Sequence, residues 1–145
     1  MKQKASALLL MMFVCSAYLT FGQGLSVEPG SCITVESGTV LNVGSGDLTL
    51  QSGATGDASL IDHGSVTFSG SGQAKVERYL TESQWHIISS PVSGAVSGMF
   101  LDDYLSYHTE ATDIWTDIVP EDIPLNVMQG YLLWSVASGP TTEVF

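Results

Sequence analysis

A short unit ending in glycine is repeated four times between Leu25 and Gly53. Successive units are offset by eight, eight and seven residues, and one apolar residue keeps its place in each unit. This pattern predicts very short strands separated by tight turns, because such turns need positive φ angles that glycine adopts at little cost. The four units are Ser26-Val-Glu-Pro-Gly30, Thr34-Val-Glu-Ser-Gly38, Asn42-Val-Gly-Ser-Gly46 and Thr49-Leu-Gln-Ser-Gly53.

Two architectures are built from units of this kind. In a β-solenoid, each strand stacks on its neighbour and the inward side chains form a continuous ladder. In a meander, the same turns join antiparallel neighbours into hairpins. The near-constant period and the short strands favour the solenoid, with about two coils in this stretch. Coils of this size cannot bury their faces alone, so they must stack on the rest of the chain.

The segment that follows the repeat, residues 54–64, contains two aspartates, Asp57 and Asp62, and two glycines but matches no calcium-binding pattern. The nonapeptide loop needs closely spaced glycines before its aspartate, and the EF-hand loop needs a terminal Glu. A solvated turn is the better interpretation.

After residue 65 the repeat gives way to longer strands and loops. Strands are expected at 66–68, Ala74–Leu80, 85–90, 104–107, from Ile114 and at 131–136, with an exposed loop over 117–126. The sequence thus predicts an all-β chain with a short β-solenoid-like region over 23–73. A β-sandwich-like region of the jelly-roll type follows over 74–145 and is expected to be incomplete at its C-terminus. Lys75 and Arg78 are each expected to pair with a carboxylate.

The first 22 residues have the features of a secretory signal peptide. Lys2 and Lys4 precede an apolar run over 5–19, and Thr20 and Gly22 are the small residues before a cleavage site at Gln23. The run is shorter than the roughly 20 residues of a membrane span. Cys15 lies inside the run and not at its end, which argues against a lipid anchor. The chain is therefore expected to be exported by the Sec pathway, with no membrane span after cleavage.

Removing this segment leaves two cationic residues against fifteen carboxylates, a net charge of −13. Such a chain is expected to bind neither nucleic acid nor anionic membranes, since both require Lys and Arg. Cys32 is then the single cysteine, which excludes an intramolecular disulfide. Its alternating apolar context predicts a small buried side chain.

No pattern of catalytic, cofactor-binding or metal-ligating residues is present. His63, His86 and His108 are too widely spaced for a typical zinc motif. Ser89 and Ser90 do not form a nucleophile elbow. Adjacent acidic residues, as in Asp102-Asp103, point to opposite faces of a strand and do not form a glycosidase pair. The sequence therefore predicts a non-catalytic chain without a cofactor.

Aromatic residues are the best functional lead. Large aromatic side chains usually fill the core, and this is the favoured interpretation. Exposed rings on a β-sandwich would instead stack on sugar rings, with carboxylates accepting the sugar hydroxyls. The candidates for such glycan stacking are Trp115, Trp134 and Tyr104, among the set Trp85, Tyr104, Tyr107, Trp115, Tyr131 and Trp134.

Two motifs carry a resemblance to a known group. They are Val76-Glu-Arg-Tyr-Leu80 and Trp85-His-Ile-Ile-Ser-Ser-Pro-Val92, supported by Trp115 and the turn Met128-Gln-Gly-Tyr131. Together with the signal peptide ending in Phe-Gly-Gln, they resemble the N-terminal region of large secreted or cell-surface proteins of Bacteroidetes. The resemblance implies a segment that joins repeat-rich β regions to β-sandwich domains. It also implies a C-terminal sorting domain for type IX secretion outside this chain, and it assigns no catalytic residues.

Three functions are compatible with these observations. The leading expectation is a non-catalytic surface or extracellular module with a structural, adhesive or display role. The alternatives are a carbohydrate-binding β-sandwich and an accessory region of a secreted hydrolase whose catalytic domain lies beyond Phe145. Glycans or other surface proteins are the expected partners.

Overall fold

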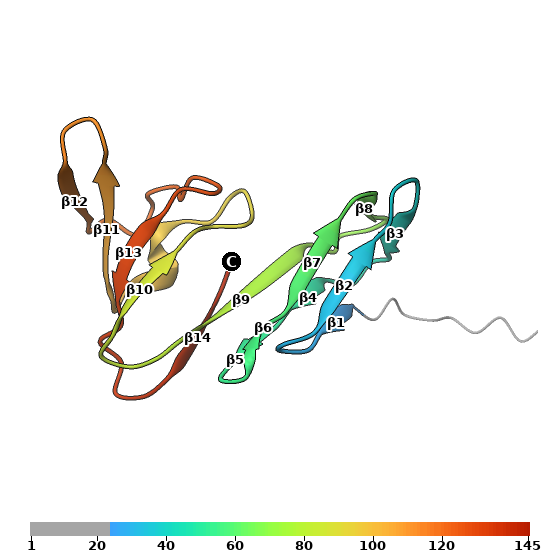
Figure 1. The fold of residues 1–145 in the computed structure, drawn as a ribbon, viewed down its shortest axis with the longest axis horizontal. Helices are drawn as coiled ribbons and strands as arrows, with labels where there is room; N and C mark the ends of the chain where they lie inside the picture. Colours follow the sequence, from blue (N-terminus) through green and yellow to red (C-terminus); the bar gives the residue numbers. More distant parts are fainter. Residues whose placement is uncertain (1–23) are drawn as a thin grey trace, which may run out of the picture.

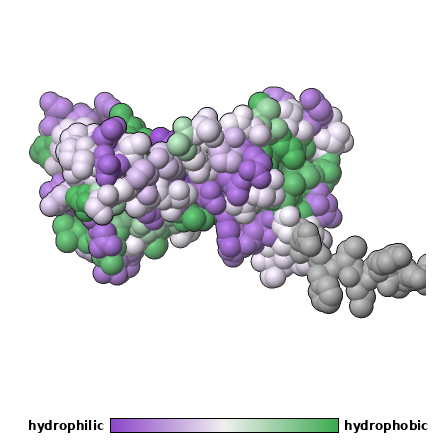
Figure 2. Space-filling model, turned by 90° about the horizontal axis from the view of Figure 1, so that it is seen from below, coloured by the Kyte–Doolittle hydropathy of each residue, from purple (hydrophilic) through white to green (hydrophobic). Residues whose placement is uncertain are grey.

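The computed structural model describes residues 24–145, so the predicted signal peptide lies outside the described residues. The described part is all-β, as the sequence predicts, and its one helical element is the 3₁₀ turn η1 (Ser97–Phe100). No helix in residues 24–145 is long and apolar enough to span a membrane. Figure 1 shows two groups of strands joined by the long strand β9, and the space-filling view narrows between them (Figure 2).

The first group of strands covers the repeat and the segment after it. Each strand is two to four residues long, in keeping with the short repeat unit. The strands are β1 (Leu25–Val27), β2 (Cys32–Val35), β3 (Val40–Val43), β4 (Leu48–Leu50), β5 (Ser52–Gly53), β6 (Gly56–Asp57), β7 (Ser59–Asp62) and β8 (Ser65–Phe68).

Strands in this group pair in parallel with strands far along the chain. Leu25 lies opposite Leu48, Cys32 opposite Ser59, and Val40 opposite Ser65. The chain thus returns to stack on an earlier strand after 23 to 27 residues, or about three repeat units. We call this length of chain one circuit. Consecutive strands pair antiparallel, as a meander requires, only at the two-residue hairpin β5–β6 within this group.

The apolar residues that move with the repeat point inward. Val27, Val43 and Leu48 are buried together, and Leu25, Ile33, Leu41, Leu60 and Phe68 pack against them. The four glycines of the repeat do not all have the same backbone conformation. Gly30 and Gly38 have φ angles of 76° and 79°, as predicted for tight turns. Gly46 and Gly53 do not, so the expectation of a positive φ is wrong for them.

Two further expectations in this group are wrong. Residues 54–64 do not form one solvated turn, because Ser59–Asp62 is the strand β7 and pairs with β2. Cys32 is exposed and not buried, since it begins β2 on the face away from the small core.

Strand β9 (Ala74–Leu80) belongs to both groups. Ala74 to Val76 pair in parallel with β4, and Glu77 to Leu80 pair antiparallel with β14 (Thr141–Val144). The two cations of β9 are paired as predicted, Lys75 with Asp47 and Arg78 with Asp57, each at 2.6 Å. The Tyr79 N–H also donates to the Ser52 hydroxyl at 2.8 Å, and this hydrogen bond and the Arg78–Asp57 pair tie the β5–β6 hairpin to β9.

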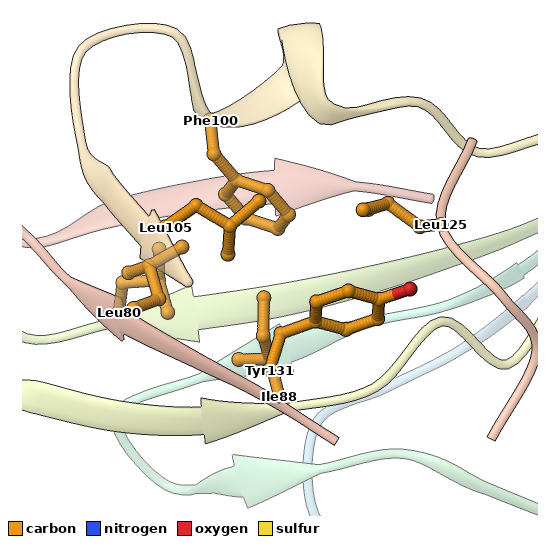
Figure 3. Packing of buried hydrophobic residues seen from close by; sticks show 7 residues of the cluster. Leu80, Ile88, Phe100, Leu105, Leu125 and Tyr131 are labelled. Carbon is orange, nitrogen blue, oxygen red and sulfur yellow. The ribbon is translucent and has the colours of Figure 1, made fainter. Parts of the chain in front are cut away.

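The second group is a four-stranded antiparallel sheet in the order β10-β13-β11-β12. The predicted strands at 85, 104, 114 and 131 are all present. Their bounds are β10 (Trp85–Ile88), β11 (Tyr104–Thr109), β12 (Ile114–Ile118) and β13 (Tyr131–Trp134). One face of this sheet packs with β9 and η1 around a core of Leu80, Ile88, Phe100, Leu105, Leu125, Tyr131 and Leu133 (Figure 3).

The sequence predicts an exposed loop over 117–126, and this prediction is wrong at both ends of the segment. Its first two residues complete β12. Leu125 is only 3% exposed and packs in the core, and its N–H donates to the Ala95 carbonyl. The next N–H, of Asn126, donates to the Tyr131 hydroxyl at 2.8 Å. This connection therefore closes one side of the core.

Candidate functional site

The two faces of the four-stranded sheet have different surroundings. Side chains alternate between the faces of a strand, so in β13 the buried Tyr131 and Leu133 face the core. Leu132 and Trp134 must then point to the opposite side, which no other element covers in Figure 1. We call this side the outer face; it carries Trp85, Ile87, Tyr104, Ser106, His108, Trp115, Asp117, Leu132 and Trp134.

Three aromatic residues form a row across the outer face. Trp85 of β10 lies opposite Trp134 of β13, which in turn lies opposite Tyr104 of β11. Residues directly opposite each other in antiparallel strands share a face, so the three rings lie side by side. The ring centroids of Trp85 and Trp134 are 5.1 Å apart and their planes are inclined by 64°. Trp85 is 58% exposed and Tyr104 69% exposed.

The next row of the outer face is mixed in character. Ile87, Leu132, Ser106 and Asp117 lie opposite one another from β10 to β12. Ile87 is 78% exposed, although its neighbour Ile88 is buried in the core. The row is therefore apolar on β10 and β13 and polar on β11 and β12, where it consists of the Ser106 hydroxyl and the Asp117 carboxylate.

A second aromatic position lies beyond this row, on β11 and β12. Trp115 lies opposite His108, with ring centroids 4.9 Å apart and planes inclined by 41°. The Nε2 atom of His108 is 3.0 Å from the Asp113 carboxylate. Trp115 is 54% exposed. The outer face thus holds two groups of aromatic rings with Ser106 and Asp117 between them.

The three residues named from sequence as candidates for glycan stacking, Trp115, Trp134 and Tyr104, all lie on this face. The favoured expectation that the aromatics fill the core is right for Tyr131 and wrong for Trp85, Tyr104 and Trp115. Trp85 was not among the stacking candidates. Its alternation with the buried Ile88 assigns it to the exposed face once the orientation of β10 is known.

Comparisons with known proteins identify no relative. No family model, no curated protein and no solved structure matches the chain. The resemblance to exported proteins of Bacteroidetes therefore depends on the sequence features quoted for it alone.

The charges that follow β9 in the chain are negative. After Arg78 the sequence contains nine carboxylates and no Lys or Arg. On β14, burial raises the pKa of Glu143, and the nearby carboxylates Asp103 and Asp102 raise it further. In the first group of strands, the hydrogen bond from Lys75 has the opposite effect and lowers the pKa of Asp47.

The three histidines of the described part lie in separate places. The Nε2 atom of His86 lies 3.0 Å from the Thr81 carbonyl oxygen, and His108 contacts Asp113. Ser90, of the serine pair before Pro91, donates its hydroxyl to the Val92 carbonyl. Within residues 24–145, no three His, Cys, Asp or Glu side chains lie close enough to hold a metal ion.

A separate cavity of about 680 Å³ lies where the two groups of strands meet. It is lined by the start of β9, by the loop 92–96 and by Phe145. Its one charged side chain, Lys75, is engaged by Asp47. This cavity offers mainly small apolar residues and brings together no group of chemically reactive side chains.

Proposed function

We propose that this chain is a non-catalytic, exported β module with a structural, adhesive or display role at the cell surface. The observation that carries the proposal is the parallel stacking of strands one circuit of the chain apart, with Leu25 opposite Leu48 and Leu48 opposite Ala74. Stacked circuits extend a chain in one direction with few residues, which suits a spacer that presents another domain.

The proposed architecture has two regions after a signal peptide over 1–22. Residues 23–73 form a short β-solenoid, supported by the 23- to 27-residue circuit and by the shared burial of Val27, Val43 and Leu48. Residues 74–145 form a β-sandwich-like region of the jelly-roll type. Its support is that β9 and β14 face the four-stranded sheet across one core.

The cellular part of the proposal is tested by locating the protein. The full-length gene product is expressed in a Gram-negative host with a C-terminal tag, and intact cells are treated with protease. We expect the protein to be cleaved in intact cells and the mature chain to begin at Gln23. A protein that keeps Met1 and stays protected inside the cytoplasm would contradict the proposal.

A second function, carbohydrate binding, is favoured by a specific observation. The residues Trp134 and Tyr104 share one row with Trp85, and Trp115 lies on the same outer face. Exposed aromatic rings beside hydroxyl and carboxylate groups are suited to sugars, which combine an apolar ring face with polar hydroxyls.

The test for this second function is binding of the mature chain to a glycan array. We expect binding to at least one class of glycan and loss of that binding when both Trp115 and Trp134 are replaced by Ala. Binding that survives the double replacement would exclude the outer face as the site.

A further inference from the structure

The outer face lacks the groups that an anionic ligand needs. No Lys or Arg follows Arg78, and nine carboxylates do. The two cations of the described part, Lys75 and Arg78, lie on β9 and are each paired with an aspartate. A polymer of uronic acids or sulfated sugars would find no cationic partner here and would be repelled by the net negative charge. The charge therefore favours an uncharged ligand.

The inclination of the rings restricts the form of the ligand. A flat crystalline surface contacts several aromatic rings at once only when those rings lie in one plane. The planes of Trp85 and Trp134 are inclined to each other by 64°. Rings set at such angles can instead contact successive units of a single flexible chain. The geometry therefore favours a soluble polymer over a crystalline one.

One polar group between the two aromatic positions completes the chemistry. Asp117 is exposed, and an ionised carboxylate accepts hydrogen bonds but donates none. Ser106 lies opposite it on β11 but is buried, so the carboxylate is the polar group that this row offers to a ligand. A sugar unit between the two groups of rings would direct its hydroxyls to the Asp117 carboxylate. The C–H groups of the neighbouring units would lie against the electron-rich ring faces.

We infer that the outer face binds a single, uncharged glycan chain. The row of Trp85, Trp134 and Tyr104 contacts one part of the glycan and Trp115 contacts another, while Asp117 accepts hydrogen bonds from hydroxyls between them. This inference rests on the proposed carbohydrate-binding role and adds the charge and the physical form of the ligand.

The experiment compares three kinds of polysaccharide with the mature chain. Native gels contain hydroxyethylcellulose or galactomannan as neutral polymers, and polygalacturonate or alginate as anionic ones. Suspensions of crystalline cellulose and chitin test adsorption to solid surfaces. We expect at least one neutral polymer to retard the protein, the anionic polymers to have no effect, and neither solid to deplete the protein. Retardation should be the same at low and high salt, because no ion pair contributes to it.

Variants assign the binding to the outer face. We expect Trp85→Ala and Tyr104→Ala each to weaken binding about tenfold, which is the order of effect expected for one aromatic contact. Trp85→Phe should weaken it less, since a ring remains. The control is Val40→Ala, because Val40 is 64% exposed and lies on β3, in the other group of strands. That variant should bind like the unchanged chain, and equal losses in all four variants would overturn the assignment.

The remaining outcomes separate this inference from the functions on which it rests. Binding to an anionic polymer, or adsorption to a crystalline solid, would overturn the inference and leave carbohydrate binding in place. Failure to bind any polymer would overturn both, but not the display role, which is tested by protease treatment of intact cells. Self-association that Trp85→Ala abolishes in sedimentation would assign the face to protein contacts and overturn the inference as well.

Discussion

The exposure of single side chains is the property in which the structure departs most from the predictions made from sequence. Cys32 occupies an alternating apolar context, yet its side chain is exposed because β2 turns its other face to the small core. Trp85 and Tyr104 are similarly exposed on the outer face. Alternation along a strand divides residues into two sets but does not say which set faces inward. That choice depends on which strands pack together, and only the structure supplies it.

The exposure of Cys32 leads to a prediction about its chemistry. In a chain that begins at Gln23, and therefore contains no Cys15, a thiol reagent should modify one cysteine per molecule rapidly without denaturant. The measurement is the release of the coloured thiol product in native buffer and in urea. Cys32→Ser should remove the signal. Modification that requires urea would show that the side chain is buried after all.

The raised pKa of Glu143 leads to a prediction about pH. The carboxyl group holds its proton more tightly in the folded chain than in the unfolded one, where its ordinary pKa is 4.5. Its ionisation therefore destabilises the fold at neutral pH, and this effect disappears as the pH falls below the ordinary value. We expect Glu143→Gln to raise Tm at pH 7 and to have no effect at pH 3, as measured by thermal unfolding. An equal rise in Tm at pH 7 and pH 3 would contradict the explanation that ionisation of Glu143 destabilises the fold.

Within the elements, the positions of the strands are predictable but their partners are not. The short alternating repeat predicts strands where β1 to β4 are found, and Ala74–Leu80 has the expected bounds. Strand β3 pairs with β8, so that each residue lies opposite one 25 positions further along the chain. No local pattern in the sequence predicts this pairing. Leu125 shows the same limit. Its acidic, proline-containing surroundings predict an exposed loop, whereas its side chain packs in the core with residues far from it in the sequence, such as Leu80 and Ile88.

The stacking of β8 on β3 is tested at Gly64, where the chain passes close to the turn before β3. A Cβ atom at this position would lie 2.6 Å from the Glu36 carbonyl oxygen and closer still to that of Thr39. We expect Gly64→Ala to lower the free energy of unfolding by about 1–3 kcal/mol, because the backbone must shift. Urea unfolding measures the loss. Gly44→Ala is the control, since its added Cβ meets no atom within 4 Å; an equal loss in both would argue against the stacking.

The two faces of β13 are tested by neighbouring leucines. Leu133 is fully buried, and Leu133→Ala should cost about 2–5 kcal/mol in the free energy of unfolding. Leu132 points to the outer face, so Leu132→Ala should cost less than about 1 kcal/mol. Chemical unfolding of the two variants gives the comparison. A larger loss at Leu132 would reverse the assignment of the faces.

At the scale of the whole molecule, the two groups of strands combine different sheet types. Parallel pairing dominates before β9, and antiparallel pairing follows it. Strand β9 pairs in parallel with β4 and antiparallel with β14, so its seven residues connect the two groups of strands. The all-β class could be predicted from alternation and turn residues. The row of Trp85, Trp134 and Tyr104 could not, since it depends on bringing together three strands that are separated by up to 49 positions in sequence.

The central claim is that the aromatic outer face is both open and the binding surface. Hydroxyl-radical footprinting of the mature chain, with and without the neutral polymer that binds it, tests this most directly. Trp85, Tyr104 and Trp115 should be modified in the free protein and protected in the complex, while Val40 on β3 remains modified in both. Rings that resist modification in the free protein, or that remain fully reactive when the glycan is bound, would contradict the claim.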